Sequence, residues 1–446
     1  MKRTASLLLA ASSVVLLLAS AGARTRSRQG GTLRVETRAD ASQWMNSALR
    51  TLVFDSLTQL DSAGSVQPAL AVRWESQSDD RRWQLWLRPG VRFQDGTPFS
   101  AATVVQSLTA GDCSGCPWRS VHAAGDAVVF ESETAVPNLP AILANSRYAI
   151  VRKDESGNLV GTGAFRYAST SNGGVMLNAV DDTWRSRPFV NAIEVRGGRS
   201  LRDQWMDVSA GRADVVEVPA DQLRRAQQDH MHLLVSRDSD LIALVVDDKS
   251  PATQDARVRE VLSMSLDRAS LFNVVFQKEG EVSASLLPNW LSGYGFLMNP
   301  APAHANALPG SVNRGAELTL SVDGGDPVLQ LIAERLALNA RDAGLNVRAL
   351  PTASRSALRL IRVHLEETNP AAAFADITAQ LAMGERVPPN DVAAVFHQEQ
   401  EALAKHTVIP LLYLPRAVTL SPRVHDFVLG SDGMIRSADF WLEDGK

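Results

Sequence analysis

The sequence predicts a mixed α/β protein with more than one sheet. Stretches typical of strands alternate with stretches of helical periodicity along most of the chain, which favours this class. Residues 241–246 form a continuous apolar run, typical of a strand that is buried on both faces. Residues 326–350 begin with Asp-Pro, continue with a helical apolar face, and pass through Gly344 into a strand-like run. This is a helix-to-strand unit of the α/β type.

The first half of the chain is expected to contain short strands and short helices. Ser100 is a favourable N-cap for a helix over 100–108, a short amphipathic turn or helix is expected over 137–143, and a further helix is expected over 200–211. Runs rich in apolar residues and bounded by glycine or turn residues predict the strands. These strands are expected at 32–37, 83–87, 126–131, 149–152, 161–167 and 213–218.

The second half contains the clearest helical signals. Thr253 or Asp255 caps a helix whose apolar residues recur at helical spacing. Asn390 is expected to cap another helix that continues to Ala404. The strand predicted at 408–414 contains Pro410, which has no N–H to donate to a ladder, so this strand is expected near a sheet edge.

The composition limits the classes of function. A chain of 446 residues with 45% hydrophobic and 21% charged residues suits two or three folded units and is too apolar for wholesale disorder. The formal net charge of −4 offers no basic excess for phosphates, so no nucleic-acid partner is expected. The sequence has no G-x-S-x-G, H-E-x-x-H or Walker A motif, and the glycine pair at 161–163 lacks a third glycine. We therefore expect no cofactor, no metal site and no enzymatic activity.

The first 23 residues have the order of a secretory signal peptide. Lys2 and Arg3 precede an uncharged apolar run over 5–19, and Ala21-Gly22-Ala23 follows as an A-x-A cleavage site. We expect residues 1–23 to be removed after Ala23 and the mature chain to be exported. An uncleaved membrane anchor is the alternative, although the apolar run is short for a span of about 20 residues.

The chain has two cysteines, Cys113 and Cys116, in the pattern C-S-G-C. In an exported chain, a close pair of thiols is expected to form a disulfide. A redox-active C-x-x-C is the alternative, but that motif begins a helix after a buried strand. Pro117 and Trp118 follow here without a helical pattern, so we expect a local clip within a loop.

A series of motifs in a collinear order resembles a known family. The order resembles that of the family 5 extracellular solute-binding proteins, the peptide and nickel receptors of ABC importers. The first motifs are P-A-L-A at 68–71, W-E at 74–75 and W-Q-L-W-L-R-P-G-V-R-F-Q-D-G-T-P-F at 83–99. The later motifs are G-T-G-A-F at 161–165, G-R-A-D-V at 211–215, D-A-R-V-R at 255–259 and L-D-R at 266–268.

The resemblance implies a two-lobed periplasmic binding protein of type II with an extra β-rich subdomain. Lobe I would comprise residues 30–45, 160–240 and 415–446, the extra subdomain residues 46–159, and lobe II residues 241–414. A small ligand would bind between the lobes, which would close by a hinge. The protein would act in the periplasm as a monomer, with the permease of an ABC importer in the inner membrane as its partner.

The ligand class stays open at this point. Short peptides are the first expectation, and sugars, nickel chelates or haem are alternatives within the same family. A secreted hydrolase with an unrecognised active site is the alternative from a different class of function.

The resemblance also implies ligand-binding residues. Peptide-binding members carry a W-x-x-D-x-x-D-P-like stretch whose acid receives the peptide amine. Residues 363–370 are the nearest match, with Glu366 in place of that acid. Asp247 lies near the position of the family's asparagine before D-x-R-V-R. The aromatic residues expected in the cleft are Trp44, Trp290 and Tyr294.

Overall fold

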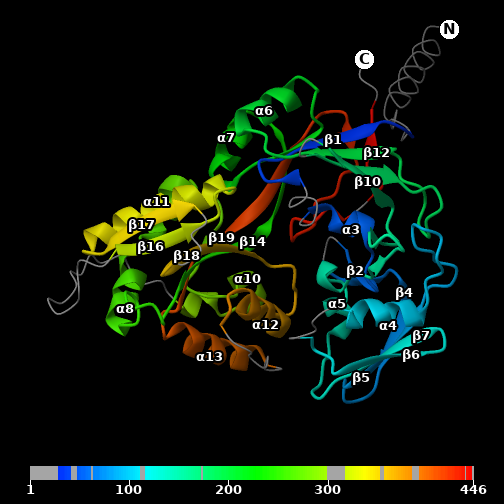
Figure 1. Ribbon diagram of the computed structural model, residues 1–446, viewed down its shortest axis with the longest axis horizontal. Coiled ribbons are helices and arrows are strands. Elements are labelled where there is room, and N and C mark those ends of the chain that lie inside the picture. The colour runs from blue at the N-terminus through cyan, green and yellow to red at the C-terminus, as the bar shows by residue number, and fades with distance from the viewer. Residues whose placement is uncertain are drawn as a thin grey trace, which may run out of the picture.

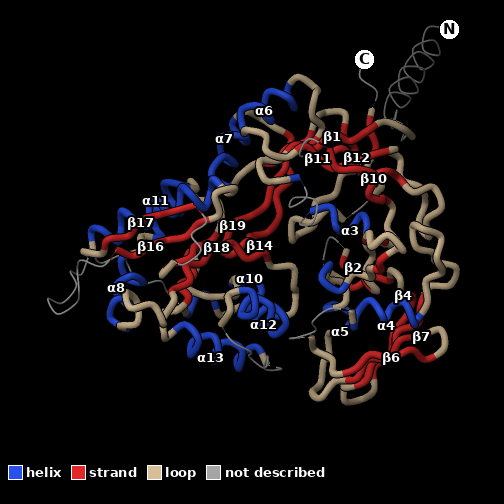
Figure 2. The backbone as a smooth tube through the Cα atoms, viewed as in Figure 1, coloured by secondary structure: helices blue, strands red, loops and turns tan. Residues whose placement is uncertain are grey.

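The structure is a computed structural model that describes residues 29–41, 48–61, 64–110, 116–171, 174–298, 317–351, 356–383, 391–436 and 438–443. Within these ranges the strands form an eleven-stranded sheet, a four-stranded sheet and three two-stranded pairs (Figures 1 and 2). The predicted residues 1–23 of the signal peptide lie outside the described residues. No helix in the described ranges combines the length and the apolar character that a membrane crossing requires.

The strands are β1 (Thr32–Glu36), β2 (Thr58–Leu60), β3 (Val66–Pro68), β4 (Ala71–Ser76), β5 (Arg82–Leu87), β6 (Ser120–Ala124), β7 (Ala127–Glu131), β8 (Arg152–Lys153), β9 (Leu159–Val160), β10 (Phe165–Ser171), β11 (Gly174–Ala179), β12 (Ala192–Arg196), β13 (Val215–Glu217), β14 (His232–Val246), β15 (Glu281–Val282), β16 (Glu317–Val322), β17 (Asn346–Pro351), β18 (Leu358–His364), β19 (Val408–Leu420), β20 (Val424–His425) and β21 (Trp441–Leu442). The helices are α3 (Arg50–Val53), α4 (Ala101–Thr109), α5 (Leu139–Ile142), α6 (Leu201–Ser209), α7 (Leu223–Gln228), α8 (Ala256–Ser265), α9 (Arg268–Ser270), α10 (Asn289–Ser292), α11 (Pro327–Asp342), α12 (Pro370–Gln380) and α13 (Val392–Leu403).

Two long strands, β14 and β19, join the two halves of the large sheet (Figure 1). On one side the sheet continues through β13, β1, β12, β11 and β10, and we call this half lobe I. On the other side it continues through β18, β16 and β17, and we call this half lobe II. The predicted mixed α/β class with two lobes is therefore confirmed.

The pairing of β14 with β19 is irregular where the strands pass between the lobes. The register shifts between Val235 and Asp238, and again between Asp238 and Asp240. A bulge bends a strand and increases its twist, so the strand pair changes direction at these shifts. Residues 236–240 and the facing residues 415–417 therefore form the connection between the lobes.

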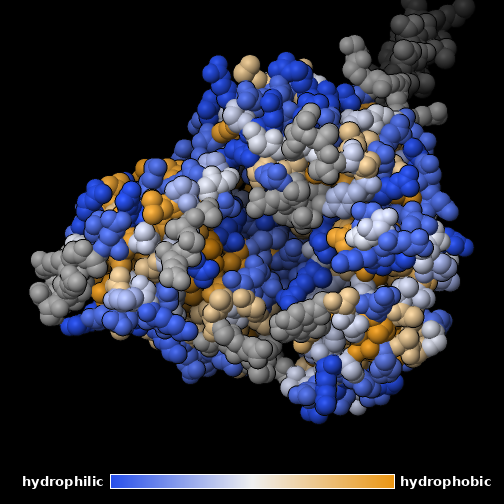
Figure 3. Space-filling view, viewed as in Figure 1, coloured by the Kyte–Doolittle hydropathy of each residue, from blue (hydrophilic) through white to orange (hydrophobic). Residues whose placement is uncertain are grey.

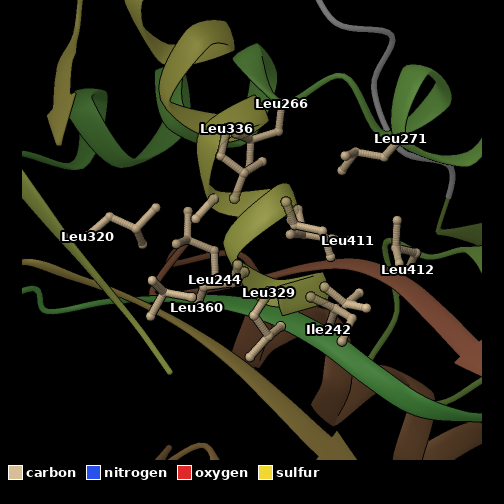
Figure 4. Packing of buried hydrophobic residues seen from close by; sticks show 14 of the residues in the cluster. Ile242, Leu244, Leu266, Leu271, Leu320, Leu329, Leu336, Leu360, Leu411 and Leu412 are labelled. Atoms are coloured by element: carbon tan, nitrogen blue, oxygen red, sulfur yellow. The ribbon is translucent and has the colours of Figure 1, made fainter. Parts of the chain in front are cut away.

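The apolar run at 241–246 is buried on both faces of the sheet, as predicted. Its alternate residues Ile242 and Leu244 pack with Leu336 of α11 in one apolar cluster (Figure 4). Leu241 lies on the opposite face, in a second cluster that includes residues of α12 and α13. The strand itself begins earlier than predicted, at His232. Its first half mixes Leu233, Leu234 and Val235 with polar residues, and pairing with β19 extends the strand over them.

The prediction that Pro410 lies near a sheet edge is confirmed at that residue. β13 pairs with β19 only at residues 418–420 and β15 only at 412–413, so β14 is the described strand that pairs with β19 at Pro410. Pro410 faces Ala243, next to a register shift between Ile242 and Ala243. A proline is tolerated at such a position because its missing N–H interrupts no ladder on the open side.

Two smaller predictions also differ from the structure. The strand expected at 149–152 shrinks to the last residue of that range and Lys153. The backbone N–H of Ile150 bonds instead to the Asp55 carbonyl at 2.9 Å. The helix expected to begin at Asn390 is α13, whose N-cap is Asp391. Asn390 lies outside the described residues.

The extra subdomain consists mainly of the four-stranded sheet β4-β5-β7-β6 with α4 packed on it. Ser100 caps α4 as predicted: its hydroxyl accepts from the Thr103 N–H, and the Thr103 hydroxyl accepts from the Ser100 N–H. Cys116 packs partly buried against the core of this subdomain. Its predicted disulfide partner, Cys113, lies outside the described residues.

The glycines of the G-T-G motif allow a close approach between two backbones. A Cβ atom at Gly161 would lie 2.0 Å from the Val53 carbonyl oxygen, and one at Gly163 would lie 2.4 Å from the Leu52 carbonyl oxygen. The Gly163 N–H donates to the Val53 carbonyl at 3.1 Å. The motif therefore packs the chain against the end of α3, which explains both glycines without a phosphate or nucleotide.

Candidate functional site

A cavity of about 560 Å³ lies between the lobes, next to their connection. Lobe I contributes Arg38, which follows β1, and Glu217, the last residue of β13. Lobe II contributes Asp323 and neighbouring residues, where β16 leads into α11. The cavity therefore lies at the carboxyl ends of parallel strands from both lobes, where ligands of open α/β sheets bind. In Figure 3 the surface is hollowed between the lobes, and hydrophilic residues gather there.

Asp240 is a buried carboxylate in the wall of this cavity. It accepts hydrogen bonds from Arg416 Nε at 2.9 Å and from Arg362 Nη1 at 3.1 Å. His364 Nδ1 lies 2.7 Å from Asp240 Oδ1, the oxygen that Arg416 Nε also contacts. Three side chains from β18 and β19 thus converge on one acid of β14. They tie the connecting strands to lobe II at the point where the pairing is irregular.

The ionisation of Asp240 follows from these contacts. Burial alone would raise the pKa of its carboxyl, but the charge of Arg416 and the hydrogen bond and charge of His364 outweigh burial and lower the pKa. Asp240 therefore carries a negative charge at neutral pH. The charge is balanced by the two guanidinium groups beside it, as a buried charge requires.

Arg362 extends this network to the start of α11. Its Nε donates to Asp326 Oδ2 at 2.9 Å, while Nη1 donates to Asp240. Asp326 also caps α11, because Oδ1 accepts from the N–H groups of Val328 and Leu329. One arginine therefore links the helix that lines the cavity to the strand that connects the lobes.

A second cavity, of only about 10 Å³, contains residues predicted as ligand-binding. Trp290 and Glu366 line it from lobe II. Asp432 and Arg436 line it from the C-terminal segment that returns to lobe I. The Trp290 Nε1 donates to the Asp238 carbonyl at 3.1 Å, which holds the indole beside the connection between the lobes.

The two acids that follow β18 bond to the extra subdomain. Glu366 Oε2 accepts from the Ser146 hydroxyl at 2.6 Å and from its N–H at 3.2 Å. Glu367 Oε1 accepts from Asn145 Nδ2 at 2.9 Å, and both of these side chains are buried. Burial, followed by the charge of Asp376, raises the pKa of Glu367 to about 8.

The structure brings some of the predicted site residues together and separates others. Glu366 and Trp290 share the small cavity. Tyr294 does not line it, and its ring packs 5.2 Å from the ring of Phe396. Asp247 is exposed in the turn after β14, at the opposite end of the β14–β18 ladder from Asp240. Trp44 lies outside the described residues.

The sequence reasoning missed the charged residues that line the larger cavity, and also His364, which contacts one of them, Asp240. Arg362 and His364 lie in a strand whose other members are mostly apolar, and Asp240 directly precedes the apolar run at 241–246. Ionisable side chains inside such strands need partners when they are buried. That pattern was the signal that could have identified them. Across the described ranges, no group of three or more His, Cys, Asp or Glu side chains is placed to hold a metal ion.

Comparison with known families gives one match to a family profile. The family is described as bacterial extracellular solute-binding proteins, family 5 (middle), and the profile matches residues 65–374. The match covers most of lobe II, the extra subdomain and part of lobe I.

The chain is also similar in sequence to the oligopeptide-binding protein AppA of Bacillus subtilis. The two are 23% identical over 263 residues, which are 53% of this chain and 48% of AppA. The chain thus spans about half the length of this curated relative.

Solved structures share the fold over most of the chain. A dipeptide-binding protein from Pseudoalteromonas sp. SM9913 in complex with Met-Leu has a TM-score of 0.78 at 16% identity. The alignment covers 93% of this chain and 100% of that protein's chain. NikA from Staphylococcus aureus in complex with Ni(L-His)2 has a TM-score of 0.74 at 16% identity, with 92% and 100% covered. At these identities the likeness shows the two-lobed fold.

Proposed function

Because the chain belongs to the bacterial extracellular solute-binding proteins of family 5, we propose that it is a periplasmic receptor. In this proposal it captures a small solute between its lobes and delivers it to the permease of an ABC importer in the inner membrane. It acts as a monomer, binds its ligand without turnover, and needs no cofactor and no nucleic acid.

The observation that carries this proposal is the cavity of about 560 Å³ between the lobes. Its volume lies within the roughly 300–1,000 Å³ of small-molecule sites. Both lobes contribute to its walls, and the walls meet at two strands whose pairing is irregular. A ligand held there would contact both lobes at once, so its binding energy would favour the closed arrangement.

Short peptides are the ligand class that we favour. Among the described lining residues, the charged side chains are four arginines and four acids: Arg38, Arg359, Arg362, Arg416, Glu217, Asp240, Asp323 and Asp326. Such balanced lining suits a zwitterion with an ammonium and a carboxylate. Two relatives are named for oligopeptide or dipeptide binding. A nickel chelate is the alternative, supported by the complex of the Staphylococcus aureus relative.

Glu366 and Trp290 are the residues that we propose to hold a cationic group of the ligand. They lie together on lobe II beside the connection between the lobes. A carboxylate that receives an ammonium forms a charge-assisted hydrogen bond, which is stronger than a neutral one. The indole offers an apolar and aromatic surface next to it.

Export and the disulfide belong to the same proposal. The order of charges and apolar residues over 1–23 supports cleavage after Ala23. The spacing of Cys113 and Cys116 supports a bridge in the periplasm, and no cysteine among the described residues is free.

Calorimetry against a library of dipeptides and tripeptides, with Ni(L-His)2 as a separate sample, tests the proposal. We expect a peptide binder whose affinity falls about ten- to a hundredfold in Glu366→Gln, because a hydrogen bond to a charged group contributes about 1.5–3 kcal/mol. Glu401→Gln, an exposed acid on α13, is the matched control and should bind like the wild type. Equal affinities in all three proteins would remove Glu366 from the site. Cleavage of the peptide during the titration would favour a hydrolase.

A further inference from the structure

Three consecutive residues of the extra subdomain each contact a different acid of lobe II. Asn145 donates to Glu367 at 2.9 Å, and Ser146 donates to Glu366 at 2.6 Å. Arg147 Nη1 donates to Asp376 Oδ1, on α12, at 3.0 Å. We call residues 145–147 the latch segment. It bridges the extra subdomain and lobe II, and the proposed ligand would have to enter between these two parts.

The latch segment is held rigidly on its own side. Asn145 Oδ1 accepts from the Arg147 N–H at 2.8 Å, so its amide nitrogen is left to reach Glu367. The next residue, Tyr148, is buried with its ring 4.9 Å from the ring of Trp118 in the subdomain core. From α3, Arg50 Nε donates to the Ser146 carbonyl at 3.2 Å. The three donors are therefore presented to lobe II in a preset arrangement.

Ser146 binds the same carboxylate, that of Glu366, that is proposed to receive the cationic group of the ligand. A hydroxyl and an N–H both donate to Glu366 Oε2, and an ammonium would donate to the same carboxylate. The cavity beside Glu366 has only about 10 Å³ in this arrangement. A cationic ligand group that binds Oε2 of Glu366 would therefore have to displace Ser146.

We propose that residues 145–147 are a latch that closes the cleft in the absence of ligand, and that Ser146 competes with a cationic ligand group for Glu366. The first part needs no ligand. The second part rests on the proposed receptor function.

The charges at the latch make its closure dependent on pH. Glu367 faces Asn145, Arg147 and Tyr148 from the subdomain, Asp376 from α12, and Glu366 from its own loop. Its pKa of about 8 in the closed arrangement exceeds the ordinary value of about 4.3 that it regains when it is exposed. Closure therefore takes up a proton. The equilibrium constant for closure is largest below the ordinary pKa. It falls as pH rises towards 8, by up to about tenfold per pH unit for one proton.

Small-angle X-ray scattering of the ligand-free protein from pH 6 to pH 9 tests the latch. We expect the wild type to have a small radius of gyration at pH 6 and a larger one at pH 9. The triple variant Asn145→Ala/Ser146→Ala/Arg147→Ala should have the larger radius throughout, and Glu367→Gln should lose the pH dependence. Ser120→Ala is the matched control, because Ser120 bonds to Glu131 within the subdomain. Circular dichroism verifies that each variant is folded.

A triple variant that is as compact as the wild type at pH 6 would overturn the latch. This measurement uses no ligand, so it decides the latch even if the proposed receptor function fails.

The competition is tested with a dipeptide that binds and with its N-acetylated form, which has no ammonium. Ser146→Ala should tighten binding of both peptides, because either must open the latch, and should tighten the free dipeptide about tenfold more than the acetylated form, because only the ammonium competes for Glu366. An equal effect on both peptides, or no effect on either, would refute the competition. Failure of every variant and of the wild type to bind any peptide would refute the peptide receptor and leave the scattering result in place.

Discussion

Replacing Asp240 by asparagine should destabilise the protein more than any other isosteric change of an acid in β14. The substitution keeps the size of the side chain but removes the charge that Arg416 and Arg362 compensate at 2.9 and 3.1 Å. Breaking a buried ion pair by removing one partner costs about 3–5 kcal/mol. Arg362 keeps Asp326 as a partner, which places the expected loss near the lower end, at about 3 kcal/mol. That is a large fraction of the roughly 5–15 kcal/mol by which folded proteins are stable.

Urea denaturation, followed by tryptophan fluorescence and by circular dichroism, measures this loss. Asp248→Asn is the matched control, since Asp248 is an exposed acid just beyond the end of the same strand and should change stability by less than about 0.5 kcal/mol. The two optical probes also reveal whether the lobes unfold separately.

The destabilisation caused by Asp240→Asn should also depend on pH, in the direction that the lowered pKa of Asp240 sets. The pKa of Asp240 is lowered in the folded protein, so its stabilisation is present above the ordinary value of about 3.9 and is lost as pH falls below it. The difference between the wild type and Asp240→Asn should therefore shrink by about 1 kcal/mol between pH 7 and pH 3. A loss below about 1 kcal/mol at pH 7, or a difference that grows in acid, would refute the reasoning.

Three further changes have effects that the same denaturation assay can measure. Ser100→Ala removes the cap of α4 and should cost about 1 kcal/mol, whereas an unchanged midpoint would mean that the capping box contributes nothing. Gly161→Ala places a Cβ 2.0 Å from a carbonyl oxygen and should cost about 1–3 kcal/mol, more than Gly324→Ala, whose Cβ would lie 3.3 Å from a proline side chain; equal effects would contradict this reading of the motif. Glu399 is buried and accepts from Ser285 and Leu287, and burial raises its pKa to about 7. Because this pKa is raised, the wild type loses stability as pH rises from about 4.3 to 7. The free energy of unfolding of Glu399→Gln should therefore increase relative to that of the wild type over this range. Parallel pH profiles of the two proteins would argue against it.

The local elements followed from the sequence where short-range chemistry decides them. Ser100, Asp255 and Asp326 cap their helices in the structure because a side-chain oxygen and the first free N–H groups lie within a few residues of each other. The two buried faces of 241–246 followed from the continuous apolar run, since no solvent-facing residue interrupts it.

The lobes and the latch depend on contacts between residues far apart in the chain. The first half of β14 is a strand because β19 pairs with it, and β19 continues beyond its predicted end at 414, where β13 pairs with its last residues. Asn145 meets Glu367 across 222 positions of sequence, a contact that no local pattern encodes.

The class of fold, the helix caps and the family resemblance could be predicted from the chain alone, because they depend on composition, spacing and the order of short motifs. The charged side chains that line the space between the lobes could be identified only after the strands had been assembled. Asp240, Arg362 and Arg416 are polar residues in mostly apolar strands, and their roles follow from the partners that burial forces them to find. Those partners come from different strands, so the site exists only once the two lobes have packed around their connecting strands.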